Sequence, residues 1–181
     1  ADRVTASVVD ADGEAVRVLE RNTRFATGPH QLRWDGLDEA GLVATDGLYR
    51  LLLDLRREGR SFLVPMVFRI DTQAPRIRLN QVGPTVFAFT GEGWLEKFWV
   101  RYFSNEKGSP MLAVDGVTVS KGRMREVGRS VLSWRGRVGG KPALAGEYAL
   151  TVHVTDRAGN RSSAIGPIVV TVNPSTESNG E

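Results

Sequence analysis

Apolar and polar residues alternate along much of this chain, with the period of two that a half-buried β-strand requires. Residues 47–55 read GLYRLLLDL, where one face carries Tyr49 and three leucines while the other face carries Arg50 and Asp54. Residues 146–155 read GEYALTVHVT and show the same alternation, with Tyr, Leu and two Val on one face. The pattern predicts a strand in each segment.

Further segments with this alternation occur in both halves. The first half offers RVTASVVD, EAVRVLE, QLRW and FLVPMVFRI, and the second offers RIRLN, TVFAFT, WLEKFWVRYFS, MLAVDGVTV, SVLSW and AIGPIVVTV. Asp–Gly pairs lie in two of the turns, which is a strong short-range signal for a hairpin. No stretch of ten or more residues has a helical pattern. Many short strands separated by turn residues are typical of β-sandwiches, so we predict an all-β protein.

A Trp–Gly–Tyr frame occurs twice along the chain. Residues 34–49 read WDGLDEAGLVATDGLY, and residues 134–148 read WRGRVGGKPALAGEY. The matched positions are Trp34 with Trp134, Gly36 with Gly136, Gly47 with Gly146, and Tyr49 with Tyr148. A repeat of about 100 residues indicates a duplicated domain and not a solenoid, whose periods are about 20–50 residues. We therefore expect two tandem immunoglobulin-like or fibronectin-like β-sandwiches.

The frame residues are expected to be structural. Trp and Tyr each bury on the order of 150–250 Å², and glycine permits positive φ in the connection between them. One Trp should therefore close the end of each core, and Trp34→Ala or Trp134→Ala should cost about 3–5 kcal/mol.

The segment IDTQAP separates the two repeats. Pro75 fixes its own φ and pushes Ala74 towards extended backbone, so the segment is expected to be a short, stiff connector. We expect the first sandwich over residues 1–72 and the second over residues 73–173. The tail, residues 174–181, has little to bury, and we expect it to be disordered.

The first repeat resembles a known bacterial module. The residues that carry the resemblance are Gly28–x–His30, Trp34–Asp35–Gly36, Gly41 and Gly47–x–Tyr49, preceded by the hairpin VVDADGEAVRVLE. They are similar to the Ig-like domain of the flagellar hook-capping protein, a module that recurs in secreted bacterial proteins. IDTQAP and VTDRAGN resemble the linker and the closing turn of successive Ig-like repeats in bacterial surface proteins. The resemblance implies an all-β spacer, adhesion or assembly module without catalysis.

Composition narrows the functional classes. The chain is 41% apolar and 25% charged, which is ordinary for a globular protein with a core. It has no Cys, which excludes disulfides, thiol catalysis and Cys-ligated metals. No apolar run is long enough for a transmembrane helix. The sequence begins at Ala1 without Met, from which we expect a processed chain or a piece of a longer one.

Positive charge is concentrated in the second half. Residues 1–75 hold 10 basic and 12 acidic residues, a net of −2, and residues 76–181 hold 14 and 9, a net of +5. A basic cluster near an aromatic side chain is a candidate dock for an acidic glycan or another anionic polymer. The basic residues are Lys121, Arg123, Arg125, Arg129, Arg135 and Arg137, and the aromatic residue is Trp99. A solvated charged loop is the commoner meaning of such a cluster, and nucleic acid is an unlikely partner.

Candidate chemistry is sparse. His30 is expected to pack beside Trp34, and His153 to face solvent, with neither at a recognisable spacing from a nucleophile. Asp35, Asp38, Glu39 and Asp46 could converge on a calcium ion. Acidic residues that are simply exposed to solvent in turns would show the same sequence pattern. We predict no catalytic residue, no cofactor and no metal, and therefore not an enzyme.

Three functions are compatible with these features. The leading hypothesis is a non-catalytic structural or interaction module of a bacterial extracellular or cell-envelope protein. The chain could alternatively supply accessory domains of a secreted enzyme, or bind a glycan or anionic polymer. Expected partners are a protein, an envelope polymer, or other domains of the same longer chain.

Overall fold

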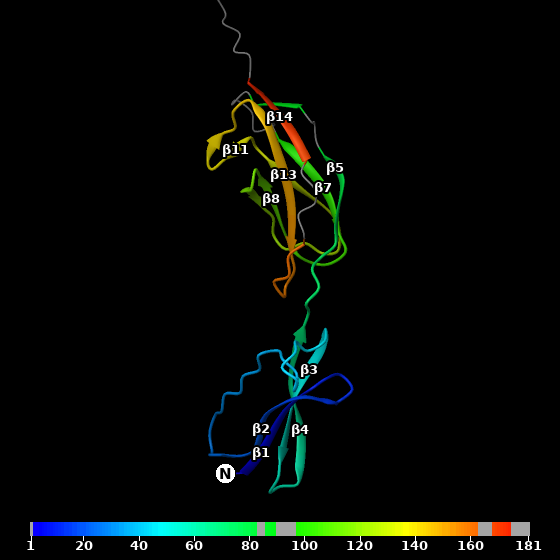
Figure 1. Cartoon of the computed structure of the whole chain (residues 1–181), viewed down its shortest axis with the longest axis vertical. Helices are drawn as coiled ribbons and strands as arrows, with labels where there is room; N and C mark the ends of the chain where they lie inside the picture. Colours follow the sequence, from blue (N-terminus) through cyan, green and yellow to red (C-terminus); the bar gives the residue numbers. More distant parts are fainter. Residues whose placement is uncertain (1, 83–85, 90–96, 163–167, 175–181) are drawn as a thin grey trace, which may run out of the picture. The chain divides into compact units, whose positions relative to one another are not determined.

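Only β-strands form regular elements in the part of the chain that the structure describes. The structure is a computed structural model, and it describes residues 2–82, 86–89, 97–162 and 168–174. These residues form two compact units, Ala1–Thr72 and Gln73–Glu181 (Figure 1). The all-β fold class is confirmed. The expectation of a disordered tail lies outside the described residues from residue 175 onward.

The first unit is built on one antiparallel sheet. Its strands are β1 (Asp2–Val9), β2 (Ala15–Phe25), β3 (Gly47–Leu55) and β4 (Arg60–Ile70), in the order β2-β1-β3-β4. The expected β1–β2 hairpin forms, and Gly13 of its turn has φ 88°. A positive φ of this kind favours glycine, which explains the Asp–Gly signal.

The second layer of the first unit contains no paired strands in the described residues. Residues 26–46 cross one face of the sheet, and their only described pairing is an isolated bridge between Leu37 and Val43. The expectation of a strand at QLRW, residues 31–34, is therefore wrong. The segment has the alternation of a strand, but no neighbouring strand pairs with its backbone.

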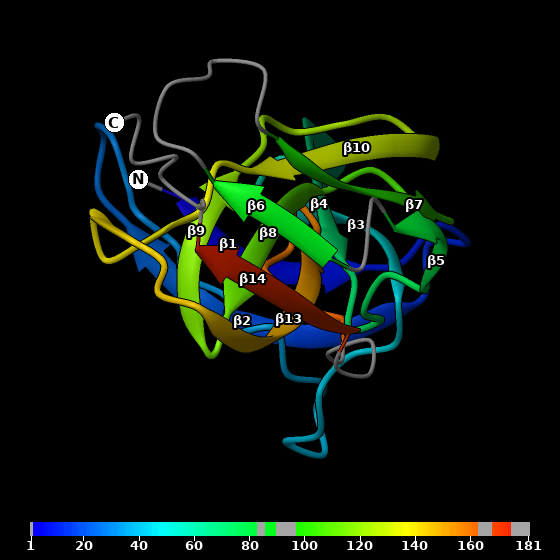
Figure 2. The same cartoon turned by 90° about the horizontal axis from the view of Figure 1, so that it is seen from above.

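The second unit is a two-layer sandwich. One sheet contains β5 (Ile77–Val82), β7 (Phe98–Ser104) and β10 (Gly128–Trp134), in the order β10-β7-β5. The other sheet contains β6 (Val86–Phe89), β14 (Ile168–Pro174), β13 (Gly146–Thr155), β8 (Ser109–Val114) and β9 (Val117–Lys121), in that order (Figure 2). All described pairs in these two sheets are antiparallel except β6 with β14.

The core of the second unit lies between its two sheets. β7 and β10 contribute one side, β8 and β13 the other. The buried members are Phe98, Val100, Tyr102, Leu112, Val114, Leu132, Trp134, Leu150, Val152 and Val154. They alternate along each strand, as the period of two predicts.

Two tight turns shape the second unit. Asp115 and Gly116 join β8 to β9 with φ of 45° and 78°, the signs that a type I′ hairpin turn requires. Gly139 and Gly140, with φ of 58° and 83°, join the short strands β11 (Arg137–Val138) and β12 (Lys141–Pro142). The sequence signals the first turn clearly, whereas we did not anticipate the second.

Candidate functional site

The Trp–Gly–Tyr frame closes a loop on itself in the first unit. The Nε1–H of Trp34 donates to the carbonyl of Leu37 at 2.9 Å, and the hydroxyl of Tyr49 donates to the carbonyl of Thr45. The backbone N–H of Ala44 donates to the carbonyl of Gly36 at 2.8 Å.

The second frame repeats these bonds. Trp134 Nε1–H donates to the carbonyl of Arg137 at 2.8 Å, and the Tyr148 hydroxyl donates to the carbonyl of Leu144 at 2.8 Å. The N–H of Ala143 donates to the carbonyl of Gly136 at 2.7 Å. Both indoles therefore lie against backbone that they also hydrogen-bond.

The paired rings are close in both units. The centroids of Trp34 and Tyr49 are 5.0 Å apart, and those of Trp134 and Tyr148 are 5.6 Å apart. These are favourable separations for tilted or edge-to-face aromatic pairs. The polar atoms of the frame hydrogen-bond to the loop between Trp and Tyr in each unit, so the frame has a structural role.

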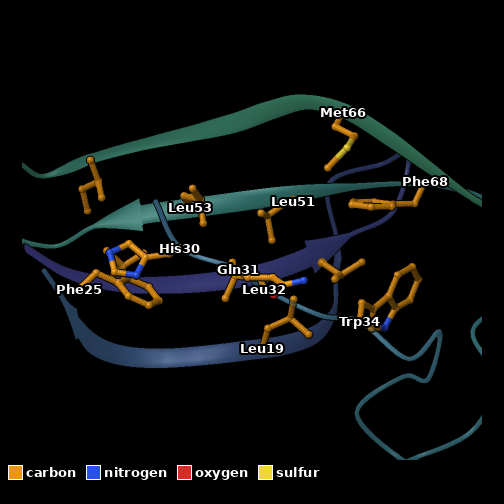
Figure 3. A pocket seen from close by; sticks show the side chains of 13 residues that line it. Leu19, Phe25, His30, Gln31, Leu32, Trp34, Leu51, Leu53, Met66 and Phe68 are labelled. Atoms are coloured by element: carbon orange, nitrogen blue, oxygen red, sulfur yellow. The ribbon is translucent and has the colours of Figure 1, made fainter. Parts of the chain in front are cut away.

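His30 is one of the residues that line an opening in the first unit (Figure 3). Its ring lies 4.5 Å from that of Phe25, centroid to centroid, at an interplanar angle of 40°, and its Nε2 donates to the carbonyl of Ala26 at 2.7 Å. His153 lies on β13 opposite Met111 and is half-buried. Burial lowers the pKa of His153, and the charge of Arg161 lowers it further, while a hydrogen bond with the Ser162 backbone opposes both.

The four candidate calcium ligands support their own turns. Asp35 accepts from the N–H of Leu37 at 3.0 Å, and Asp38 accepts from the N–H of Leu42 at 2.9 Å. Glu39 accepts from the N–H of Val18 at 3.2 Å, and Asp46 accepts from both the N–H and the hydroxyl of Thr72. Among the described residues, none of the four belongs to a group of three or more candidate ligands.

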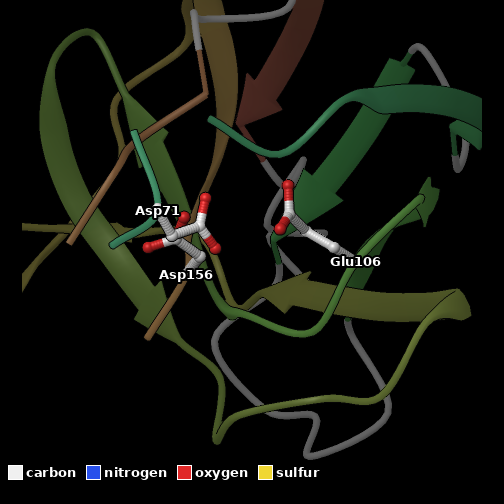
Figure 4. Close-up of side chains that lie close together, drawn as sticks. All are labelled: Asp71, Glu106 and Asp156. Atoms are coloured by element: carbon white, nitrogen blue, oxygen red, sulfur yellow. The ribbon is translucent and has the colours of Figure 1, made fainter. Parts of the chain in front are cut away.

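Two other carboxylates approach each other in the second unit (Figure 4). A carboxylate oxygen of Glu106 lies within 4.8 Å of one of Asp156. Asp156 is also committed to a turn, because it accepts from the N–H groups of Gly159 at 2.7 Å and Asn160 at 2.9 Å. Asp71, the third residue labelled in the figure, belongs to the first unit. Ca²⁺ takes about 6–8 oxygen ligands, so two carboxylates do not define a site.

The structure divides the predicted basic cluster among three places. Lys121 ends β9, and Arg123 and Arg125 lie in the connection that follows. Arg129 lies near the start of β10, while Arg135 and Arg137 follow its end. All six basic side chains are exposed. A strand advances about 3.3 Å per residue, so the seven-residue β10 separates the two ends of the cluster.

A different set of residues gathers on the outer face of the β10-β7-β5 sheet. The guanidinium of Arg101 lies 4.8 Å from the ring centroid of Trp99. Two residues further along β7, Phe103 pairs in register with Arg129 on β10 and with Arg78 on β5. We call this set the arginine–aromatic face; it comprises Arg76, Arg78, Trp99, Arg101, Phe103 and Arg129.

A shallow cavity of about 560 Å³ lies on the arginine–aromatic face. Arg76, Arg78, Phe103 and Arg129 line it together with Asn105. The cluster predicted from the sequence includes Arg129 and Trp99 but not the arginines of β5 and β7. The alternation of RIRLN and FWVRYFS could have found them, since it puts each arginine opposite the core positions.

The first unit has an apolar opening that is similar in size to this cavity. It measures about 520 Å³ and runs between the sheet and the segment that carries His30 and Trp34 (Figure 3). Leucines of β2 and β3, together with Met66 and Phe68 of β4, form its floor and side. We call this opening the apolar groove.

No helix among the described residues has the length and apolar character to span a membrane.

The FlgD Ig-like domain family matches residues 1–57. The basal-body rod modification protein FlgD of Salmonella typhimurium is 32% identical over 71 residues, which is 39% of this chain and 30% of that protein. FlgD of Salmonella typhi matches to the same extent. The chain thus spans less than one third of the length of these relatives.

Two solved structures share lower similarity. The fibronectin(III)-like modules of Clostridium thermocellum CbhA have a TM-score of 0.46 at 13% identity, covering 99% of this chain and 84% of theirs. The BSP domain of a biofilm associated protein has a TM-score of 0.35 at 14% identity, covering 95% and 25%. By sequence, residues 1–57 of the first unit are similar to the FlgD Ig-like domain, the resemblance that its Trp–Gly–Tyr frame indicated.

Proposed function

We propose that this chain is a non-catalytic structural and interaction module of a bacterial extracellular or cell-envelope protein. The duplicated frame carries the proposal. In both units the same indole, hydroxyl and amide groups hydrogen-bond the same loop positions. A scaffold that is duplicated with its internal bonds intact serves spacing and presentation of surfaces.

The module presents exposed loops and sheet faces to a partner. Ig-like domains of the FlgD type support this role by similarity over residues 1–57. The described carboxylates of the frame loops are engaged with backbone N–H groups, and this is what a folding role requires of them.

Cell fractionation tests the proposal. An antibody raised against the 181 residues is used to blot cytoplasm, envelope and medium of the source bacterium. We expect the signal in envelope or medium; a signal confined to cytoplasm would overturn the proposal. A band far above 19.8 kDa in the medium, together with hydrolytic activity in the same precipitated polypeptide, would instead favour accessory domains of a secreted enzyme.

The arginine–aromatic face favours a second candidate function, the binding of an anionic polymer. Guanidinium groups pair with carboxylate or phosphate groups, and Trp99 and Phe103 offer flat surfaces on which sugar rings can stack. Both features lie on one sheet face of one unit.

A pair of charge-matched variants tests this second function. Binding of fluorescent polygalacturonate and of polyphosphate is measured for the full chain, for Arg78→Ala/Arg129→Ala and for Arg123→Ala/Arg125→Ala. Both variants remove two positive charges. We expect the first variant to lose at least about tenfold in affinity and the second only about twofold, because only the first changes the arginine–aromatic face. Equal losses would point to general electrostatics and contradict a built site.

A further inference from the structure

The sheet of the first unit has the same strand order as four of the five strands in the larger sheet of the second unit, so these strands can be matched. Aligning Tyr49 with Tyr148 matches β3 with β13. The hairpin β1–β2 then matches β8–β9, and β4 matches β14, because each set holds the same place in its sheet. Aligning Trp34 with Trp134 matches residues 28–34 with β10.

The matched positions differ sharply in burial. Leu150 and Val152 of β13 are 0% and 1% exposed, whereas their counterparts Leu51 and Leu53 are only half-buried. Trp134 is 1% exposed, whereas Trp34 is half-buried. The same apolar face is therefore closed in one unit and open in the other.

This difference in burial arises because no strand of the described first unit pairs with residues 28–34. In the second unit all seven residues of β10 pair with β7. β7 also places Phe98, Val100 and Tyr102 over the core, where they are at most 1% exposed. In the first unit the matched place is the apolar groove, about 520 Å³ in volume.

The backbone beside the groove is suited to accept a strand. His30, Leu32 and Trp34 line the groove at alternate positions, and Gln31 lines it as well (Figure 3). The first three correspond to Ser130, Leu132 and Trp134 of β10, which are less exposed than Arg129 and Val131. Their backbone groups take part in no described ladder. An unpaired extended segment beside an apolar floor is a template for an added strand. Pro29 has no N–H, so pairing should begin at His30.

We propose that the apolar groove is completed by an extended polypeptide strand, joined to the amino-terminal end of β1, that pairs antiparallel with residues 30–34. The strand presents large apolar side chains at alternate positions, as β7 does. In the second unit four residues separate β7 from β8, so a short connection suffices. The groove and its filled counterpart in the second unit support this occupant.

A polypeptide fits this place better than an apolar small molecule. Filling the groove with an apolar ligand would cover the leucines but leave the N–H and C=O groups of residues 30–34 unpaired, and burying such groups unpaired is costly. A strand satisfies both requirements at once. The inference adds a further strand to the first unit of the proposed scaffold, and its failure would leave the cellular location of the protein unchanged.

A graft within the full chain tests the proposal. Val4 pairs with Leu55 as Pro110 pairs with Val154, so Val4 and Pro110 are equivalent positions. A copy of residues 98–106 placed directly before Ala1 therefore reproduces the spacing between β7 and β8. The control carries the same copy with Phe98→Ser, Val100→Ser and Tyr102→Ser made in the copy only.

Hydrogen exchange and disulfide trapping read out the graft. We expect amide exchange at residues 30–34 to slow at least about tenfold with the apolar copy relative to the serine copy. Because the chain has no Cys, register can also be trapped. Val131 pairs with Arg101, so Gln31→Cys should cross-link with Arg101→Cys in the copy, and Arg33→Cys, two residues along, should cross-link at least about tenfold more slowly.

Three outcomes would overturn the proposal. The first is equal exchange at residues 30–34 with both copies, and the second is equal cross-linking at Gln31→Cys and Arg33→Cys. The third is concentration-dependent dimerisation of the ungrafted chain with protection of the same residues, since the occupant would then be a second copy of the chain. The trapping arm remains informative if a graft lowers overall stability.

Discussion

Trp134 should contribute more to the stability of the second unit than Trp99, although both are indoles on neighbouring strands. Trp134 is 1% exposed and lies in the core, whereas Trp99 lies half-buried on the outer face beside Arg101. A buried Trp removes on the order of 150–250 Å² from water, worth roughly 4–6 kcal/mol. Part of that area is already buried in the unfolded chain, so Trp134→Ala should cost about 3–5 kcal/mol.

The control substitution separates burial from ring chemistry. Trp99→Ala removes a cation–π contact of a half-buried ring on the outer face and should cost about 1 kcal/mol. Trp134→Phe keeps most of the apolar volume but leaves the carbonyl of Arg137 without its 2.8 Å bond, so we expect an intermediate cost.

Urea unfolding of the full chain measures these costs. Because the two units can unfold separately, the transition of the second unit is followed by hydrogen exchange of β13 amides alongside circular dichroism. A cost of Trp99→Ala equal to that of Trp134→Ala would refute the reasoning, since it would mean that core burial does not distinguish the two indoles.

Three further predictions concern the second unit. Gly108→Ala should destabilise it by about 1–3 kcal/mol in urea unfolding, because an added Cβ would lie 2.5 Å from Val154. The lowered pKa of His153 means that, below its ordinary pKa of about 6.5, the unfolded chain binds a proton that the folded chain resists. The free energy of unfolding should therefore fall from about pH 8 to about pH 5 more for the natural chain than for His153→Gln; parallel profiles would contradict this. Asp156→Ala should cost about 1–3 kcal/mol in thermal or urea unfolding by leaving turn amides unpaired, and Asp156→Asn should recover part of that loss.

Local patterns in the sequence were sufficient for the strands with the clearest alternation. Segments 47–55 and 146–155 form β3 and β13 with the expected bounds. The Asp115–Gly116 turn also forms with both φ values positive. These features depend on side chains a few residues apart, and the period of two expresses directly which of them face a core.

Pairing between distant segments could not be predicted from local sequence patterns. Residues 31–34 have strand alternation but remain unpaired, while the matched residues 131–134 pair with β7. The sequence pattern is the same because the inward side chains are similar, and the difference lies in whether a neighbouring strand is present.

The candidate surfaces show the same division. The sequence by itself determined that the chain is all-β, that it carries a duplicated Trp–Gly–Tyr frame, and that its basic residues concentrate in the second half. Only the tertiary structure decided that Arg78 and Arg129 flank Phe103 on one sheet face, and that the apolar face of the first unit is open. Alternation fixes the face of a strand on which a residue lies, whereas sheet pairing decides which distant residues become its neighbours.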